Sequence, residues 1–180
     1  MPASRRLSHR ISEGDGIAII VHVGDVAAAR AAEDDGAKAL ALDGPIAGIR
    51  DATSLPLLWL GGGEPVDADA LAVRPGDGDA GDGELETVVD VRDEDELERA
   101  LEELDPEIFL ISAQQADEGD DPVESVLELL PDVPAGKLAI ADVAVANRDE
   151  VMALERAGFD AVLVPAGRVR DLVGSGPPDV

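Results

Sequence analysis

Three side chains that can transfer a proton or bind a metal ion lie at the ends of short aliphatic runs: His22, Asp90 and Asp142. A carboxylate can act as a general base, or as a general acid when protonated, if its target is within hydrogen-bonding distance. One histidine and two carboxylates could also bind a metal ion. A single histidine at the end of an apolar run is more typical of a core or rim residue, so we predict no metal site. The absence of cysteine excludes thiolate nucleophiles and cysteine-ligated metals.

Two glycine-containing segments could approach a phosphate group through their backbone N–H groups. Gly167 and Arg168 follow the last aliphatic run, where a guanidinium beside backbone donors could hold a phosphorylated ligand. The alternative is that Arg168 is a solvated arginine at the start of a helix. The triple glycine at 61–63 lacks the spacing and the lysine of a P-loop, and it predicts a tight exit from a strand.

The elements that must position these residues recur along the chain at intervals of roughly twenty residues, which is typical of strand and helix units. The clearest helix is 93–104, which has acidic residues in its first turn and apolar residues at helical spacing. The sequence predicts eight strands, in runs that begin at Ile17, Ala37, Pro56, Asp69, Glu86, Glu107, Lys137 and Asp160. Eight such runs favour a compact (β/α)8 TIM barrel over an open doubly wound sheet, which would use fewer strands and full helices.

Several crossovers of this barrel are too short and too rich in Gly, Pro and Asp for full helices. The segments 43–54, 61–68 and 74–85 therefore predict abbreviated helices or loops, and GDGDAGDGE at 76–84 predicts a mobile loop.

The length of 180 residues favours a single domain. We expect a flexible N-terminal tail over 1–16, one barrel over 17–173 and a C-terminal tail over 174–180.

The formal net charge of -26 disfavours nucleic acid and anionic membranes as partners, because both select Lys and Arg. The basic N-terminus precedes only a short apolar run, 17–23, which fits neither a signal peptide nor a membrane span. We therefore expect a cytoplasmic protein, and we favour a monomer. The acidity is consistent with solubility in salt or with a basic protein partner.

Three segments resemble indole-3-glycerol-phosphate synthases. ETVVDVRDEDELERAL from Glu86 is similar to the family's LVEVHDEEEL, NRDEVMALERAGFDAVLV from Asn147 to TREDVERLREAGADAVLV, and LPLLWLGG from Leu55 to LPVLRKDF. The resemblance extends with gaps over roughly 17–173. It implies a TIM-barrel lyase of tryptophan biosynthesis, which decarboxylates and closes the ring of an anthranilate-ribulose phosphate without a metal or organic cofactor.

Matching the family's functional residues to this chain gives one retained carboxylate and several substitutions. Asp90 stands at the position of the family's catalytic glutamate, although pairing with Arg92 or water is an alternative role for it. Ser112 stands at the position of an asparagine. Asp142, with the two residues after it, replaces the family's Glu-Ser-Gly.

The other positions have lost their chemistry. Ile19 and Val21 match the charged pair of the first strand, and Leu60 matches the lysine that acts as general acid. Pro165 matches the phosphate-binding glycine, and proline has no N–H to donate. The family's N-terminal segment over the pocket has no counterpart in residues 1–16, so we expect a mouth open to water.

These substitutions predict a synthase-like barrel with little or no activity in the family's reaction. One alternative is an altered lyase or isomerase on a sugar phosphate, with Asp90 as base, Asp142 as acid and Arg168 binding phosphate. Another is a non-catalytic protein whose acidic surface meets a basic partner.

Overall fold

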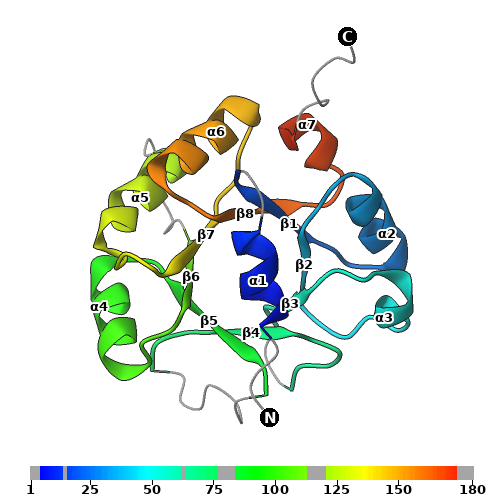
Figure 1. Ribbon diagram of the computed structural model, residues 1–180, viewed down its shortest axis with the longest axis horizontal. Coiled ribbons are helices and arrows are strands. Elements are labelled where there is room, and N and C mark those ends of the chain that lie inside the picture. The colour runs from blue at the N-terminus through cyan, green and yellow to red at the C-terminus, as the bar shows by residue number, and fades with distance from the viewer. Residues whose placement is uncertain (1–4, 14–15, 62–63, 77–83, 113–120, 174–180) are drawn as a thin grey trace.

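Eight parallel strands close into a barrel in the computed structural model, which describes residues 5–13, 16–61, 64–76, 84–112 and 121–173. Each strand pairs with the next along the chain, and β8 pairs with β1 (Figure 1). The strands are β1 Ala18–His22, β2 Ala39–Leu42, β3 Leu57–Trp59, β4 Ala70–Val73, β5 Glu86–Val91, β6 Ile108–Ser112, β7 Leu138–Asp142 and β8 Ala161–Pro165. The expected eight-stranded closed barrel is confirmed, and the open sheet is excluded.

Helices cover the barrel unevenly, as the crossover lengths predict (Figure 1). They are α1 Arg6–Ser12, α2 Val26–Asp34, α3 Ile49–Ala52, α4 Glu94–Glu103, α5 Pro122–Leu129, α6 Arg148–Ala157 and α7 Val169–Val173, with a 3-10 turn at Leu130–Asp132. The crossover after β2 contains only the four-residue α3. The described parts of the crossovers after β3 and β4 contain no helix. Most of the segment expected to be a mobile loop, and the expected C-terminal tail, lie outside the described residues.

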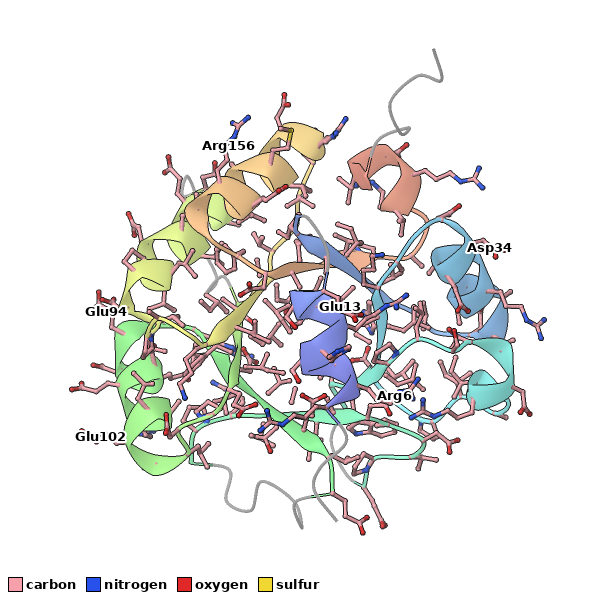
Figure 2. The ribbon with its side chains drawn as sticks, in the orientation of Figure 1. Arg6, Glu13, Asp34, Glu94, Glu102 and Arg156 are labelled. Carbon is pink, nitrogen blue, oxygen red and sulfur yellow. The ribbon has the colours of Figure 1, made fainter. Side chains whose placement is uncertain are left out.

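The longer helices begin at residues that cap their first turn. The side chains of Asp25, Asp93, Asp121 and Asn147 each accept a hydrogen bond from a backbone N–H in the turn that follows. Away from the barrel, charged side chains of these helices point outward, among them Glu94, Glu102 and Arg156 (Figure 2). The capped end of each of these helices therefore follows the C-terminal end of the strand before it.

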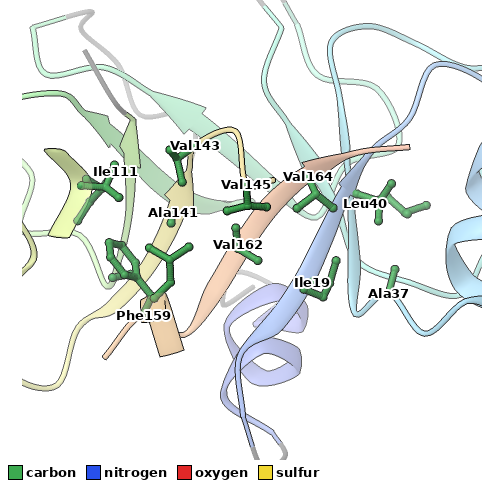
Figure 3. Packing of buried hydrophobic residues seen from close by; sticks show 14 of the residues in the cluster. Ile19, Ala37, Leu40, Ile111, Ala141, Val143, Val145, Phe159, Val162 and Val164 are labelled. Atoms are coloured by element: carbon green, nitrogen blue, oxygen red, sulfur yellow. The ribbon is translucent and has the colours of Figure 1, made fainter. Parts of the chain in front are cut away.

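The hydrophobic core has two layers separated by the strands. The outer layer lies between strands and helices and includes Ile19, Val162 and Phe159 (Figure 3). The inner layer fills the barrel with small and branched side chains such as Ile20 and Leu163. Trp59 is buried in the outer layer, and its Nε1–H has no acceptor among the described residues.

The expectation of a tail over residues 1–16 is wrong for residues 6–12, which form α1 at the centre of the barrel (Figure 1). Leu7 and Ile11 are buried in the inner core layer. The helix begins against β5, where the carboxylate of Glu86 accepts hydrogen bonds from the N–H groups of Leu7 at 2.7 Å and of Ser8 at 3.2 Å. A carboxylate at this position satisfies free N–H groups and complements the helix dipole.

Ion pairs hold the same helix to the starts of neighbouring strands. Arg6 pairs with Asp69 at 3.0 Å, and Arg5 pairs with Glu107 at 3.1 Å. Asp69 is only 6% exposed. Its carboxylate also pairs with Arg50 at 3.0 Å and accepts a hydrogen bond from the N–H of Leu57 at 2.9 Å. The α1 helix therefore closes the N-terminal end of the barrel and leaves the C-terminal end as the mouth.

Candidate functional site

A pocket of about 640 Å³ lies at the C-terminal ends of the strands. Its apolar surface comes largely from inner-layer side chains, and ionisable groups line the rest. The lining residues are His22, Asp43, Leu60, Gly61, Leu71, Ala72, Val73, Arg74, Asp90, Arg92, Leu110, Asp142 and Leu163. In TIM-barrel enzymes, this end of the barrel carries the active site.

Two carboxylates of the pocket meet at one hydroxyl group. Ser112, at the end of β6, lies between Asp90 of β5 and Asp142 of β7, with Oγ 2.8 Å from Asp90 Oδ1 and 3.4 Å from Asp142 Oδ2. A serine hydroxyl donates one hydrogen bond and accepts others. When Ser112 donates to Asp90, a protonated Asp142 can donate to the Ser112 oxygen. The three side chains can therefore carry a proton from one carboxyl group to the other.

The surroundings of Asp142 favour its protonated form. Burial raises the pKa of this carboxyl group, and the negative charge of Asp90 raises it further. The hydrogen bond from Ser112 and the positive potential of His22 and Arg92 act in the opposite direction but do not cancel the increase. Asp142 is thus suited to hold a proton, whereas Asp90 lies 3.8 Å from the Arg92 guanidinium.

His22 projects into the mouth from β1, and its Nε2 lies 2.6 Å from Asp43 Oδ2. Both residues also line a second cavity, of about 350 Å³, between the loops that follow β1 and β2. The matching of Ile19 and Val21 to functional positions is wrong, because both residues face the helices in the outer core layer. The inward-facing residues of β1 are Ala18, Ile20 and His22, which alternate with Ile19 and Val21.

The end of β3 is held tightly against the residue that binds His22. A Cβ atom on Gly61 would lie 1.9 Å from the carbonyl oxygen of Asp43, so only glycine fits there. The expected tight exit from this strand is confirmed at Gly61, and residues 62–63 lie outside the described residues. No group of three or more His, Cys, Asp or Glu in the described part of the chain could hold a metal ion.

Glu96, in the first turn of α4, links the ends of β4 and β5. Its Oε1 lies 2.8 Å from an Arg74 guanidinium nitrogen, and its Oε2 accepts a hydrogen bond from the Arg92 N–H at 2.9 Å. Asp93 caps the same turn by accepting from the Glu96 N–H at 2.8 Å. This variant of a capping box fixes two arginines at the rim of one pocket.

Gly167 and Arg168 lie after β8 and do not line the mouth pocket. A guanidinium nitrogen of Arg168 donates to the carbonyl of Ala146 at 2.9 Å, and its Nε lies 3.9 Å from Asp171. Gly167 has a φ of 85°, which fits a turn between β8 and α7. The mouth therefore brings together His22, Asp90, Ser112 and Asp142, but not Gly167 and Arg168.

Sequence reasoning missed Asp43, Arg74 and Glu96. Asp43 and Arg74 each directly follow a strand, so the rule that found Asp90 and Asp142 would also have found them. Glu96 is three residues after the helix cap Asp93, which is the spacing of a capping box.

Comparison with known proteins agrees with the architecture and only partly with the family resemblance. No family model matches the sequence. A segment of 80 residues is 32% identical to the indole-3-glycerol phosphate synthase of Campylobacter fetus subsp. fetus (strain 82-40), and it covers 44% of this chain but only 31% of that relative. The chain thus matches less than a third of the relative's length.

A solved structure extends the comparison to most of the chain. The N-acetylmannosamine-6-phosphate 2-epimerase from Clostridium perfringens superposes with a TM-score of 0.61 at 16% identity, over 82% of this chain and 86% of the epimerase. The fold is a TIM barrel. Among the described residues, no helix is long and apolar enough to span a membrane.

Proposed function

We propose that this TIM barrel binds a small phosphorylated carbonyl compound and moves a proton on it, as an isomerase, epimerase or lyase does. The observation that carries the proposal is the Asp90–Ser112–Asp142 group, in which one hydroxyl lies within 3.4 Å of two carboxyl groups. Environments that separate the proton affinities of two neighbouring carboxyl groups are typical of general acid and base pairs. Such chemistry needs no oxidant or reductant.

In the proposed step, the Asp90 carboxylate removes a proton from the carbon next to the substrate's carbonyl group. The electron pair of that C–H bond forms a C=C bond, and the carbonyl oxygen takes the proton of Asp142. The enediol then takes the proton of Asp90 on carbon and gives an oxygen proton to Asp142, which regenerates a carbonyl group and the starting protonation state of both carboxyl groups. Ser112, hydrogen-bonded to both, holds the two carboxyl groups in place during these transfers.

The indole-forming reaction of the partly similar synthase is not the activity that we propose. Leu60 occupies the position matched to that family's general-acid lysine, and its apolar side chain lines the mouth pocket. Pro165, matched to the phosphate-binding glycine, ends β8 and has no N–H. In this proposal, the protein shares the barrel and one carboxylate position with those synthases but acts on a different substrate.

The superposed epimerase supports the substrate class. By its name, that protein acts on a sugar phosphate, and it covers most of the same barrel. Fold similarity at 16% identity carries no residue roles, so the assignment here depends on the geometry at the mouth.

The test is proton exchange with solvent, because it requires no knowledge of the product. The purified protein is incubated in D2O with a set of aldose and ketose phosphates, and deuterium incorporation next to the carbonyl is followed by NMR. We expect exchange in the wild type, which Asp90→Asn reduces by about 10²–10⁴-fold and the exposed-surface control Asp34→Asn leaves unchanged. Exchange at the wild-type rate in Asp90→Asn would contradict the proposal.

The same purified proteins are also tested for the reaction of the indole-3-glycerol-phosphate synthases. We expect no formation of indole product from the anthranilate-ribulose phosphate at high enzyme concentration. Indole formation that depends on Asp90 would instead place the protein among the synthases.

A further inference from the structure

We infer that Arg74 and Arg92 form the subsite for the phosphate group of the substrate, at the ends of β4 and β5. The inference rests on the proposed function and adds the place where the anionic end of the ligand binds. Both arginines line the mouth pocket that contains Asp90 and Asp142. A guanidinium group donates several hydrogen bonds in a planar fork that fits phosphate oxygens.

Glu96 holds these two arginines in a defined arrangement. It pairs with the Arg74 guanidinium through one oxygen and binds the Arg92 backbone through the other. Glu96 therefore binds the backbone of Arg92 and not its side chain, whose ion pair with Asp90 is long, at 3.8 Å. A phosphate dianion can replace that weak contact with shorter, charge-assisted hydrogen bonds.

The charge distribution of the chain favours anion binding at these two arginines over the rest of the surface. The sequence contains 14 Lys and Arg against 40 Asp and Glu, whereas the mouth pocket is lined by two arginines and three aspartates, so positive side chains are enriched there. A small anion approaching the protein meets a repulsive field overall and is attracted only where positive groups are gathered. Within the mouth, Arg74 and Arg92 follow β4 and β5, and the His22–Asp43 pair lies at the ends of β1 and β2.

The alternative subsite after β8 has weaker support in the described residues. Arg168 is bound to the Ala146 carbonyl and does not line the mouth pocket. The α7 helix is only five residues long, and Pro165 at the end of β8 offers no N–H.

The position of Arg92 also matches the reacting groups. Arg92 and Asp90 are two residues apart in the chain, and the Arg92 guanidinium lies 3.8 Å from Asp90 Oδ2. A short phosphorylated sugar can bridge this distance with its phosphate at Arg92 and its carbonyl carbon near Asp90. The arrangement therefore selects a ligand whose phosphate and carbonyl are separated by only a few carbon atoms.

Glycerol 3-phosphate is a suitable probe, because it carries the phosphate and cannot react. Its binding is measured by isothermal titration calorimetry at fixed ionic strength, with uncharged glycerol as the matched ligand control. We expect the wild type to bind the phosphate ester and not glycerol. Arg92→Gln is expected to weaken binding by about 10- to 100-fold, Arg74→Lys to weaken it less, and Arg168→Gln to leave it unchanged.

The outcomes separate this inference from the proposed function. Asp90→Asn is expected to bind glycerol 3-phosphate at least as tightly as the wild type while losing deuterium exchange, because substrate binding and proton transfer use different groups. Weaker binding in Arg168→Gln with unchanged binding in Arg92→Gln overturns the subsite, even if exchange is observed. An absence of binding in the folded wild type also overturns it, and thermal unfolding of each variant verifies folding.

Discussion

The two ends of this barrel use carboxylates in opposite ways. At the closed end, Glu86 and Asp69 are 7% and 6% exposed, and each accepts backbone hydrogen bonds or pairs with arginine. At the mouth, Asp90 and Asp142 share a single hydroxyl donor between them. A buried carboxylate whose hydrogen bonds are all made stabilises the fold. A carboxyl group buried next to another carboxylate has a raised pKa instead.

The contrast follows the general division of labour in TIM barrels, in which the C-terminal face carries chemistry and the N-terminal face carries stability. In this chain, the division is visible within a single strand. β5 begins with Glu86, which binds the α1 helix, and turns Asp90 into the mouth four residues later. Substitutions at the two ends should therefore affect different measurements.

The largest expected effect is on turnover at the mouth. Asp90→Asn removes the proposed base and should slow deuterium exchange by about 10²–10⁴-fold, with little change in the free energy of unfolding. Exchange kinetics and urea denaturation, followed by the fluorescence of Trp59, measure the two quantities on the same protein. A variant that lost stability and activity in proportion would remove the distinction between the two ends.

The next effect is on stability at the closed end. Leu7→Ala leaves a cavity where α1 enters the inner core, and such truncations cost about 2–5 kcal/mol. Urea denaturation should show this loss, with substrate exchange unchanged under conditions in which the variant is folded. The exposed Arg10→Ala on the same helix is the control and should be nearly neutral. Equal effects of the two substitutions would mean that the helix does not plug the barrel.

Glu86→Ala tests the polar part of the same closure. It leaves the N–H groups of Leu7 and Ser8 without their carboxylate, at an expected cost of about 1–3 kcal/mol. Glu86→Gln retains an acceptor oxygen and should lose less. Hydrogen exchange of the two backbone amides reports the local effect, and unchanged protection in Glu86→Ala would show that the contact does not stabilise α1.

The smallest expected effect is a gain in stability at the mouth. The pKa of Asp142 is raised by burial and by Asp90, so the folded state retains this proton over a pH range in which the unfolded state has lost it. Its contribution is largest below the ordinary carboxyl pKa and is lost as pH rises through the raised value. Asp142→Asn should therefore stabilise the protein near neutral pH, by about 2–4 °C for a gain on the order of 1 kcal/mol.

Thermal unfolding at several pH values tests this sign. The gain should shrink below the ordinary carboxyl pKa, where Asp142 is protonated in both states. Asp160, whose pKa is also raised by burial, remains in the variant and retains part of the pH dependence. A loss of stability in Asp142→Asn at neutral pH would show that the charged form is favoured in the fold.

The barrel was predictable from the sequence because its strands are short aliphatic runs separated by helix caps or by glycine-rich turns. Which side chains of β1 face the inside of the barrel was not predictable, because the run IAIIVHV is apolar on both sides and shows no alternation. A shift of one residue moves every side chain to the other face, which is why His22, and not Val21, lies in the mouth.

The α1 helix escaped prediction for a different reason. A seven-residue helix is unstable alone, and this one is held by carboxylates 63 to 102 residues away in the chain. The raised pKa of Asp142 is likewise a property of three neighbouring strands. Sequence reasoning placed the groups at the strand ends, but their burial and spacing emerge only when the barrel closes.

The contacts of α1 also have a consequence for the order in which the protein folds. The segment precedes its partners Asp69, Glu86 and Glu107 in the chain by 63 to 102 residues, so it is synthesised before them. Until then, Leu7 and Ile11 have no core to enter, and closing such distant contacts slows folding. The α1 helix can therefore make all of these contacts only after the chain has been synthesised as far as Glu107.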